Sequence, residues 1–316
     1  MERKVLVFGD QFVEPGEKKI LRLLVGHLPS GTRIYIHIHV NRAMDPGPVI
    51  LLIGGMHGDE INGIEIVRQA GQKYIQSALQ QGTLITIPLL NVYGFIHFTR
   101  EVTDGKDVNR SFPGSTKGSL ASRIARMLYK KVLPQVDALI DFHTGGNQRY
   151  NYPQIRFTKN DLPSIELADV FKAPFMLAST AKPNSLRQDA SKMKIPNLAF
   201  EGGESGRFDG FSIEKGLQGI RCILEHFQMV IPAVNPINPH SHTLTGDTWI
   251  RATYSGIFIW QRASGVYVNK GEILGSISDP DSMRIEYIKA KTSGYIIGHN
   301  NAPVVHVGDA LFHIGW

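Results

Sequence analysis

The chain has 316 residues, of which 42% are hydrophobic and 20% are charged, a composition typical of a soluble globular protein. This length allows a large core and favours two domains over one. The net charge is +6, but the basic residues are scattered, so nucleic-acid binding is not expected. No apolar segment is long enough to span a membrane. The single cysteine, Cys222, cannot form an internal disulfide, which favours a reducing cytoplasm.

Residues 1 to 48 are predicted to be rich in β-strands. Within them, residues 33–40 alternate between polar and apolar side chains, which is the pattern of a half-buried strand. His37 and His39 share the polar face of this strand. Two histidines at this spacing could bind a metal ion, but an exposed polar face is the better interpretation.

The next strand, residues 49–53, is continuously apolar and ends in two glycines. A helix-like pattern then runs to about residue 78. His57 and Glu60 therefore lie at the carboxyl end of a buried strand, where open α/β sheets bind ligands. Their spacing of three lets both side chains face one point. This pair alone is weak evidence, because a polar helix start gives the same pattern.

Two later apolar runs end in the same manner. Residues 137–142 lead into His143, and the shorter run 198–200 leads into Glu201, each with glycines close behind. Strands that alternate with helices predict a mostly parallel or mixed sheet with helices on both faces. Because parallel strands end at one edge of a sheet, we expect His57, His143 and Glu201 to meet there.

Other elements are predicted around these strands: a strand over 83–90 and helices over 119–132 and 213–229. The stretch 100–114 is a polar loop that is too long and too rich in specific polar groups for a simple connection. Such loops usually carry function.

A change in character marks the carboxyl-terminal part of the chain. The stretch 231–242 contains three prolines and predicts a linker. We therefore expect a hydrolase domain over residues 1–235 and a β-rich domain over residues 243–316. His240 and His242 in the linker are interpreted as solvated side chains.

The β-rich part contains an internal repeat. Residues 255–258 recur at 293–296, and residues 270–274 recur at 307–311, which predicts two stacked β units. This part resembles the barrel-sandwich hybrid domain of biotinyl and lipoyl carriers. The position of their modified lysine is Met283-Arg284-Ile285 here. Since Arg284 cannot accept the cofactor, we expect a scaffold or lid rather than a carrier.

Three of the singled-out side chains predict a metal site. His57, Glu60 and His143 would supply two imidazoles and one carboxylate, the ligand set of carboxypeptidase-type zinc enzymes. Such enzymes also need a carboxylate that moves a proton from water to the leaving amine. Glu201 is the candidate for this role, and Glu204 is the second choice.

Cationic residues of the polar loop complete the candidate site. Arg100 could stabilise the oxyanion that forms on the attacked carbonyl. Asn109 and Arg110 could bind a substrate carboxylate, since a guanidinium grips it with two hydrogen bonds. Each arginine taken singly is better explained as a surface ion pair, so the argument depends on their joint occurrence.

The joint pattern resembles one known family. Its parts are Gly-Gly-Met-His57-Gly-Asp-Glu60, then Arg100, Asn109-Arg110-Ser-Phe-Pro-Gly, Asp-Phe-His143-Thr-Gly-Gly and Phe-Glu201-Gly-Gly. Over roughly residues 48 to 230 the chain resembles the succinylglutamate desuccinylase/aspartoacylase family, the deacylase branch of the zinc carboxypeptidase superfamily.

The resemblance implies a fold and a site. The fold is a zinc carboxypeptidase-like mixed α/β sheet with helices on both faces, followed by a smaller all-β, barrel-sandwich-like domain. The site is one Zn²⁺ held by His57, Glu60 and His143, with Glu201 as general base, Arg100 at the oxyanion and Asn109 with Arg110 on a carboxylate. A substrate-binding tyrosine of the wider superfamily has no assigned counterpart, and Tyr254 and Tyr287 stay unassigned.

These features predict a cytoplasmic zinc-dependent deacylase that hydrolyses the amide of an N-acyl amino acid or a related small amide, as a monomer or a homo-oligomer. The alternative is a zinc carboxypeptidase acting on short peptides. Two histidines and a carboxylate also bind non-haem iron in oxygenases. Neither a Gly-x-Ser-x-Gly nucleophile elbow nor a phosphate-binding loop occurs in the sequence.

Overall fold

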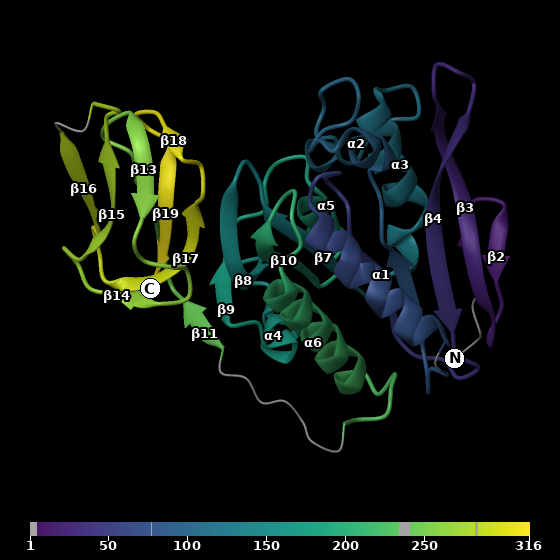
Figure 1. The fold of residues 1–316 in the computed structure, drawn as a ribbon. Helices are drawn as coiled ribbons and strands as arrows, with labels where there is room; N and C mark the ends of the chain where they lie inside the picture. Colours follow the sequence, from purple (N-terminus) through teal and green to yellow (C-terminus); the bar gives the residue numbers. More distant parts are fainter. Residues whose placement is uncertain (1–4, 77, 234–240, 282–283) are drawn as a thin grey trace.

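The computed structural model describes residues 5–76, 78–233, 241–281 and 284–316. These parts of the chain form an α/β fold with further strands at the carboxyl-terminal end (Figure 1). The helices are α1 (Ile61–Gln76), α2 (Val92–His97), α3 (Leu120–Lys131), α4 (Leu162–Phe171), α5 (Leu186–Lys192) and α6 (Gly210–His226), with short 3₁₀ turns η1 (Val108–Arg110) and η2 (Leu133–Gln135).

The strands of the amino-terminal two thirds are β1 (Leu6–Phe8), β2 (Gln11–Val13), β3 (Lys18–His27), β4 (Arg33–Arg42), β5 (Val49–Ile53), β6 (Thr83–Ile87), β7 (Ala138–Gly145), β8 (Arg149–Phe157), β9 (Phe175–Ala178) and β10 (Asn197–Glu204). Those of the last third are β11 (His242–Leu244), β12 (Asp247–Arg251), β13 (Gly256–Trp260), β14 (Tyr267–Val268), β15 (Ile273–Ser278), β16 (Ile285–Lys289), β17 (Gly294–Asn300), β18 (Val304–Val305) and β19 (Ala310–Gly315).

One large sheet runs through the molecule in the order β12-β19-β17-β8-β10-β7-β5-β6-β4-β3. At its centre β10, β7, β5 and β6 are parallel to one another. The flanking strands β8 and β4 run antiparallel to β10 and β6, so the sheet is mixed, as the sequence predicts. The apolar run of β5 is buried along nearly its whole length, which is typical of a parallel strand covered on both faces.

Helices cover both faces of this sheet, which also confirms the prediction. α1, α4 and α6 pack on one face in a core with the central strands, and α2, α3 and α5 lie on the other face. Ser119 and Asp209 explain where α3 and α6 begin. Each side chain accepts a hydrogen bond from the backbone N–H three residues further on, which satisfies a free donor of the first turn.

From β12 onwards the carboxyl-terminal strands pair antiparallel, whereas β11 runs parallel to β9. β13, β15, β16 and β18 form a separate four-stranded sheet, which shares a core around Phe258, Ile277 and Phe312 with β12, β17 and β19. β17 also pairs with β8, where Gly298 lies opposite Asn151, so the large sheet continues into this region. The predicted division into two domains stays a prediction, because residues 234–240 at the boundary lie outside the described residues.

The internal repeat corresponds to two antiparallel strand pairs, β13 with β15 and β17 with β19. Gly271 and Gly308 hold equivalent positions ahead of β15 and β19. Their φ angles of +89° and +93° lie in the left-handed region, which explains the glycine at both positions. Two residues with sequence-based interpretations, His240 and Met283, lie outside the described residues. Among the helices that are described, each is too short or too polar to span a lipid bilayer.

Several boundaries differ from the predicted ones. The run 83–90 ends as a strand at Ile87, whereas β7 and β10 extend past His143 and Glu201 instead of ending before them. Pairing of β10 with neighbours on both sides holds these residues in the sheet. The segment between residues 149 and 192 contains two strands and two helices for which no pattern was identified in the sequence.

Candidate active site

The strand ends meet as predicted. β10, β7 and β5 are neighbours, and the loop after β5 carries His57 towards His143. Gly55 explains part of this geometry: its φ is +60°, and a Cβ there would press against Leu89. A Cβ on Gly58 would overlap the backbone of Gly94, so glycine lets the loop pack directly on α2.

His57, Glu60 and His143 form a buried cluster. His57 Nδ1 lies 2.7 Å from Glu60 Oε1, and His143 Nδ1 lies 2.8 Å from Glu60 Oε2. One ligand atom from each residue lies within 4.8 Å of the other two. Of the described residues, this is the group of three whose donors converge closely enough to hold a metal ion.

The second ring nitrogen of each of the two histidines is hydrogen-bonded to a further carboxylate. His57 Nε2 lies 3.2 Å from Asp107 Oδ1, and His143 Nε2 lies 2.7 Å from Asp141 Oδ2. Such bonds fix the ring orientation and leave Nδ1 as the nitrogen that faces a metal. Neither carboxylate was assigned a role from the sequence.

Charges within the cluster outweigh the effect of burial. Burial disfavours the charged imidazoles, but the neighbouring carboxylates raise the pKa of both His57 and His143. Burial also opposes the charge on Glu60, yet the two imidazoles lower its pKa. Two imidazole nitrogens and one carboxylate at the edge of a cleft are the donors of a catalytic zinc site, so these side chains fit a zinc ion.

Arg100 from the polar loop reaches this cluster. Its Nη1 lies 3.2 Å from Glu60 Oε1, and its Nη2 lies 2.9 Å from Asp107 Oδ2. Asn109 and Arg110 of the same loop line the adjoining cleft. Asn109 Oδ1 accepts a hydrogen bond of 2.9 Å from the backbone N–H of Leu186, which fixes the loop against α5.

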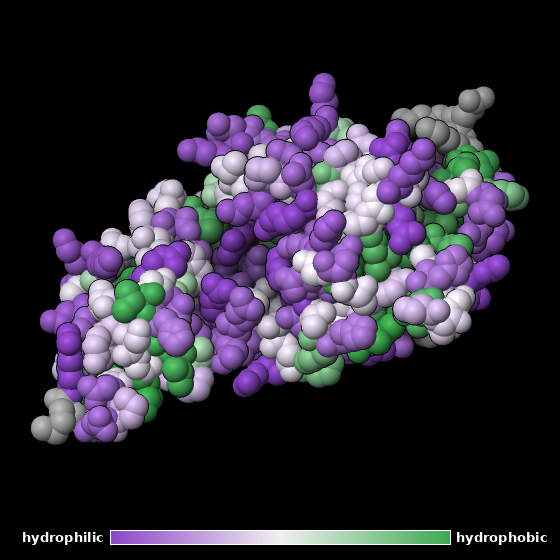
Figure 2. All heavy atoms as spheres, turned by 90° about the horizontal axis from the view of Figure 1, so that it is seen from above, coloured by the Kyte–Doolittle hydropathy of each residue, from purple (hydrophilic) through white to green (hydrophobic). Residues whose placement is uncertain are grey.

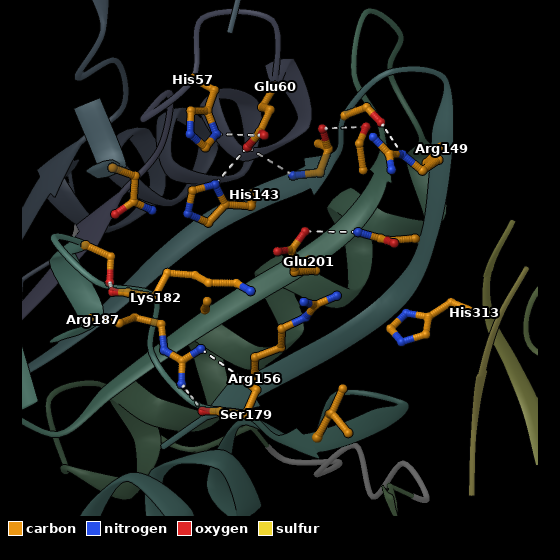
Figure 3. Close-up of a pocket in the computed structure, with 18 of the residues that line it drawn as sticks. His57, Glu60, His143, Arg149, Arg156, Ser179, Lys182, Arg187, Glu201 and His313 are labelled. Atoms are coloured by element: carbon orange, nitrogen blue, oxygen red, sulfur yellow. Dashed lines mark hydrogen bonds and ion pairs between the residues drawn. The ribbon is translucent and has the colours of Figure 1, made fainter. Parts of the chain in front are cut away.

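Glu201 lies on the strand next to His143. Asn151 Nδ2 on β8 donates a hydrogen bond of 3.0 Å to Glu201 Oε2 (Figure 3). The strand then bulges between Glu201 and Glu204. Within that bulge Gly203 has a φ of +78°, which favours glycine at this position.

A cleft of about 730 Å³ adjoins these groups. Seen from above, the surface in Figure 2 is hollowed where hydrophilic residues gather between the carboxyl-terminal strands and the rest of the molecule. Cations outnumber carboxylates in the lining. The cations are Arg100, Arg110, Arg149, Arg156, Lys182 and Arg187, and the carboxylates are Glu60, Glu201 and Asp247.

Much of this lining was not identified in the sequence. Arg156 and Arg187 come from the segment whose elements were not predicted, and Asp247, Trp249 and His313 come from the carboxyl-terminal strands. The signal that could have identified one missed group is the spacing of Asp141 and His143. Residues two apart in a strand lie on the same face.

The remaining candidate residues lie outside the cleft lining. Glu204 accepts a hydrogen bond of 2.6 Å from Asn301 Nδ2. The guanidinium of Arg284 lies 4.4 Å from the centroid of the Tyr254 ring, and the Tyr287 side chain is exposed.

Comparisons with known proteins agree with this architecture. Residues 46–227 match the model of the succinylglutamate desuccinylase/aspartoacylase catalytic domain. The N-alpha-acetyl-L-2,4-diaminobutyric acid deacetylase of Halomonas elongata is 26% identical over 279 residues, which cover 84% of this chain and 81% of that protein.

Solved structures show the same fold. The succinylglutamate desuccinylase/aspartoacylase from Rhodobacter sphaeroides has a TM-score of 0.86 and 23% identity over 98% of this chain and 99% of that one. The product-bound ectoine utilization protein EutE (DoeB) from Ruegeria pomeroyi has a TM-score of 0.85 and 21% identity over 100% and 99% of the two chains. Because the family model matches more than half of its length, the chain belongs to the succinylglutamate desuccinylase/aspartoacylase family.

Proposed function

We propose that the chain is a zinc-dependent hydrolase that cleaves the amide bond of an N-acyl amino acid and releases a carboxylate and a free amine. The observation that carries this proposal is the convergence of His57, Glu60 and His143 on one point beside the carboxylate of Glu201. Membership of a deacylase family supports it, as does the name of the Halomonas elongata relative, a deacetylase of an N-acetyl amino acid.

Each side chain of the site has a separate role in the reaction. Zinc, when held by the three ligands, supplies a water molecule of lowered pKa and polarises the carbonyl. Glu201 takes the proton of the attacking water and delivers it to the amide nitrogen as the C–N bond breaks. Asn151 orients Glu201 through its hydrogen bond. Arg100, held by Asp107, donates to the oxygen on which negative charge develops.

Asn109 and Arg110 bind the carboxylate of the amino acid. Because Asn109 Oδ1 is occupied by the backbone of Leu186, its amide NH₂ is the part that donates to a ligand. Arg110 is exposed, and its Nη1 donates to the Asn109 carbonyl at 2.6 Å, which leaves other N–H groups for a substrate carboxylate.

A small amide suits the cleft better than a longer peptide. Strands β12 and β19 contribute Asp247, Trp249 and His313 to its lining, so the carboxyl-terminal strands bound the space beside the metal ligands. This wall supports an N-acyl amino acid as substrate over the peptides of the carboxypeptidase alternative.

Steady-state hydrolysis by zinc-loaded protein tests the proposal, with N-acetyl and N-succinyl amino acids beside dipeptides as substrates. We expect turnover of the N-acyl amino acids. Preference for dipeptides would favour the carboxypeptidase, and absence of all amide hydrolysis would overturn the proposal. Metal analysis is an independent test, since bound iron with oxygen-dependent turnover would favour the oxygenase. The proposed compartment is the cytoplasm, which cell fractionation tests.

A further inference from the structure

The cleft has a cationic end that the proposed hydrolysis does not use. Arg156 on β8 is the register partner of Ala199, two residues before Glu201 on β10, and Arg187 reaches the same region from α5. Figure 3 shows both arginines on the far side of Glu201 from the metal-ligand cluster. Because β8 lies two strands from β7, this end is about 10 Å across the sheet from His143.

The carboxylates near the two guanidiniums lie beyond ion-pair distance: Asp247 acts on Arg156 by its charge, and Glu201 and Asp141 act on Arg187. Neither forms an ion pair with a carboxylate in the described part of the chain, and the Nε of each is buried without a hydrogen-bond partner. Arg187 donates to the Oγ and the carbonyl of Ser179 at 3.0 and 3.1 Å, which orients it without neutralising it. Burial and the charge of Arg156 lower the pKa of Arg187 to about 10. A carboxylate of a ligand would stabilise both cations.

One carboxylate of the carboxyl-terminal strands also lines this cleft. Asp247 Oδ2 accepts a hydrogen bond of 2.5 Å from His313 Nε2, and the His313 ring stacks on Trp249 with centroids 4.3 Å apart. These contacts fix the carboxylate, while 40% of its side chain stays exposed. No group among the described residues bonds to Oδ1, which is therefore available to a cationic group of a ligand.

We propose that this end of the cleft binds a free α-amino-acid head group, with its carboxylate on Arg156 and Arg187 and its ammonium on Asp247. The arrangement matches the head group in charge: two guanidiniums face one carboxylate, and one fixed carboxylate faces one ammonium. The inference rests on the proposed hydrolase function and specifies its substrate.

The substrate is then an amide whose acyl chain ends in this head group, as in γ-glutamyl amides of amino acids. Water adds to the carbonyl carbon of the side-chain amide, and the C–N bond breaks. The proton taken by Glu201 passes to the leaving nitrogen. The products are a free α-amino dicarboxylic acid and an amino acid whose carboxylate lay on Asn109 and Arg110.

A pair of substrates that differ in one ammonium group tests this inference. γ-L-Glutamyl-L-alanine and N-glutaryl-L-alanine share every other atom of the acyl chain. With the zinc-loaded protein we expect kcat/KM for the γ-glutamyl compound to be higher by about tenfold or more, the value of a hydrogen bond between charged groups. The Asp247→Asn variant should lose most of this preference. Glu286→Gln, which removes an ion-paired carboxylate of β16 outside the cleft lining, should keep it.

Binding of the product gives a second measurement that needs no turnover. By titration calorimetry the wild-type protein should bind L-glutamate more tightly than glutarate, and Asp247→Asn should reduce the difference. Arg156→Gln should weaken both ligands. Equal affinity for glutamate and glutarate, or equal kcat/KM for the two amides, would overturn the inference even if N-acyl amino acids are hydrolysed. Glutamate binding that depends on Asp247, without hydrolysis of any amide, would instead overturn the proposed function. Thermal melting of each variant checks that it is folded.

Discussion

Glu201 and His143 are register partners on the adjacent parallel strands β10 and β7. Partners in a parallel pair project from the same face of the sheet, and neighbouring strands lie about 4.8 Å apart. This relationship brings a carboxylate beside the metal-ligand cluster without using any of the cluster's own atoms. Substitution of Glu201 should therefore affect proton transfer without affecting metal binding, whereas substitution of His143 should affect metal binding.

The first prediction concerns Glu201→Gln. The amide has nearly the same shape but cannot accept a proton, so we expect zinc content close to that of the wild type and kcat lower by about 10²- to 10⁴-fold. Zinc per chain and steady-state deacylation are measured on the same preparation. Glu204→Gln is the matched control, because Glu204 lies outside the cleft lining and should leave kcat near the wild-type value. Retained activity in Glu201→Gln would assign the base elsewhere, and Glu204→Gln would then show whether that residue acts instead.

The second prediction concerns His143→Ala. Loss of a residue that is hydrogen-bonded to a metal ligand typically weakens metal binding by about 10- to 100-fold. Removal of one of the three ligands themselves should weaken zinc binding by more than this. Asp141→Asn tests that smaller effect, since Asp141 holds His143 Nε2 and leaves Nδ1 as the proposed ligand atom. Competition with a zinc-binding dye measures both affinities. His37→Ala, an exposed histidine of β4, is the control. Undiminished affinity in His143→Ala would remove this residue from the ligand set.

A residue of this site can be predicted from the sequence only where the residues next to it in the chain form a recognisable pattern. The apolar runs before His57 and His143 are strong patterns, because central parallel strands are buried on both faces. Arg156 and Arg187 carry no such signal. They lie on a strand and a short helix whose polar and apolar residues follow no clear period, so each has the local pattern of a surface charge. The pairing of β8 with β10 brings Arg156 to the cleft, and the packing of α5 against β10 brings Arg187 there.

The carboxyl-terminal strands could likewise be predicted only in part. Their internal repeat is visible in the sequence because two similar strand pairs need the same turn glycines, at Gly271 and Gly308. The contribution of Asp247 and His313 to the cleft could not be predicted from the sequence. It depends on the pairing of β17 with β8, a contact between segments more than 140 residues apart in the chain.

The third prediction concerns Arg110→Ala. If Arg110 binds a substrate carboxylate, its loss should raise KM by about tenfold for N-acyl amino acids with a free carboxylate, which is the value of a hydrogen bond between charged groups. The matching carboxamides should show little change, because they offer no carboxylate for Arg110 to bind. Initial-rate kinetics with both substrate forms measure the difference. An equal effect on acids and carboxamides would argue against this role.

The fourth prediction concerns the pH dependence of stability. His299 on β17 is 6% exposed, its ring packs against Tyr150 and Trp260, and its Nδ1 lies 2.7 Å from Ser264 Oγ. Burial lowers the pKa of His299 to about 4. The half-buried phenol of Tyr150, whose pKa is raised to about 12, stays neutral across the acidic range.

A histidine with a lowered pKa binds fewer protons in the folded state than in the unfolded chain, where its pKa is about 6.5. Its contribution is therefore fully present above pH 6.5 and is lost as the pH falls towards 4, at up to about 1.4 kcal/mol of unfolding free energy per pH unit. Urea unfolding at pH 7, 6 and 5 measures the slope. His299→Gln cannot titrate and should flatten it, whereas the exposed His37→Gln should not. The same slope in His299→Gln and the wild type would show that other groups govern acid stability in this window, such as His313, whose pKa burial also lowers.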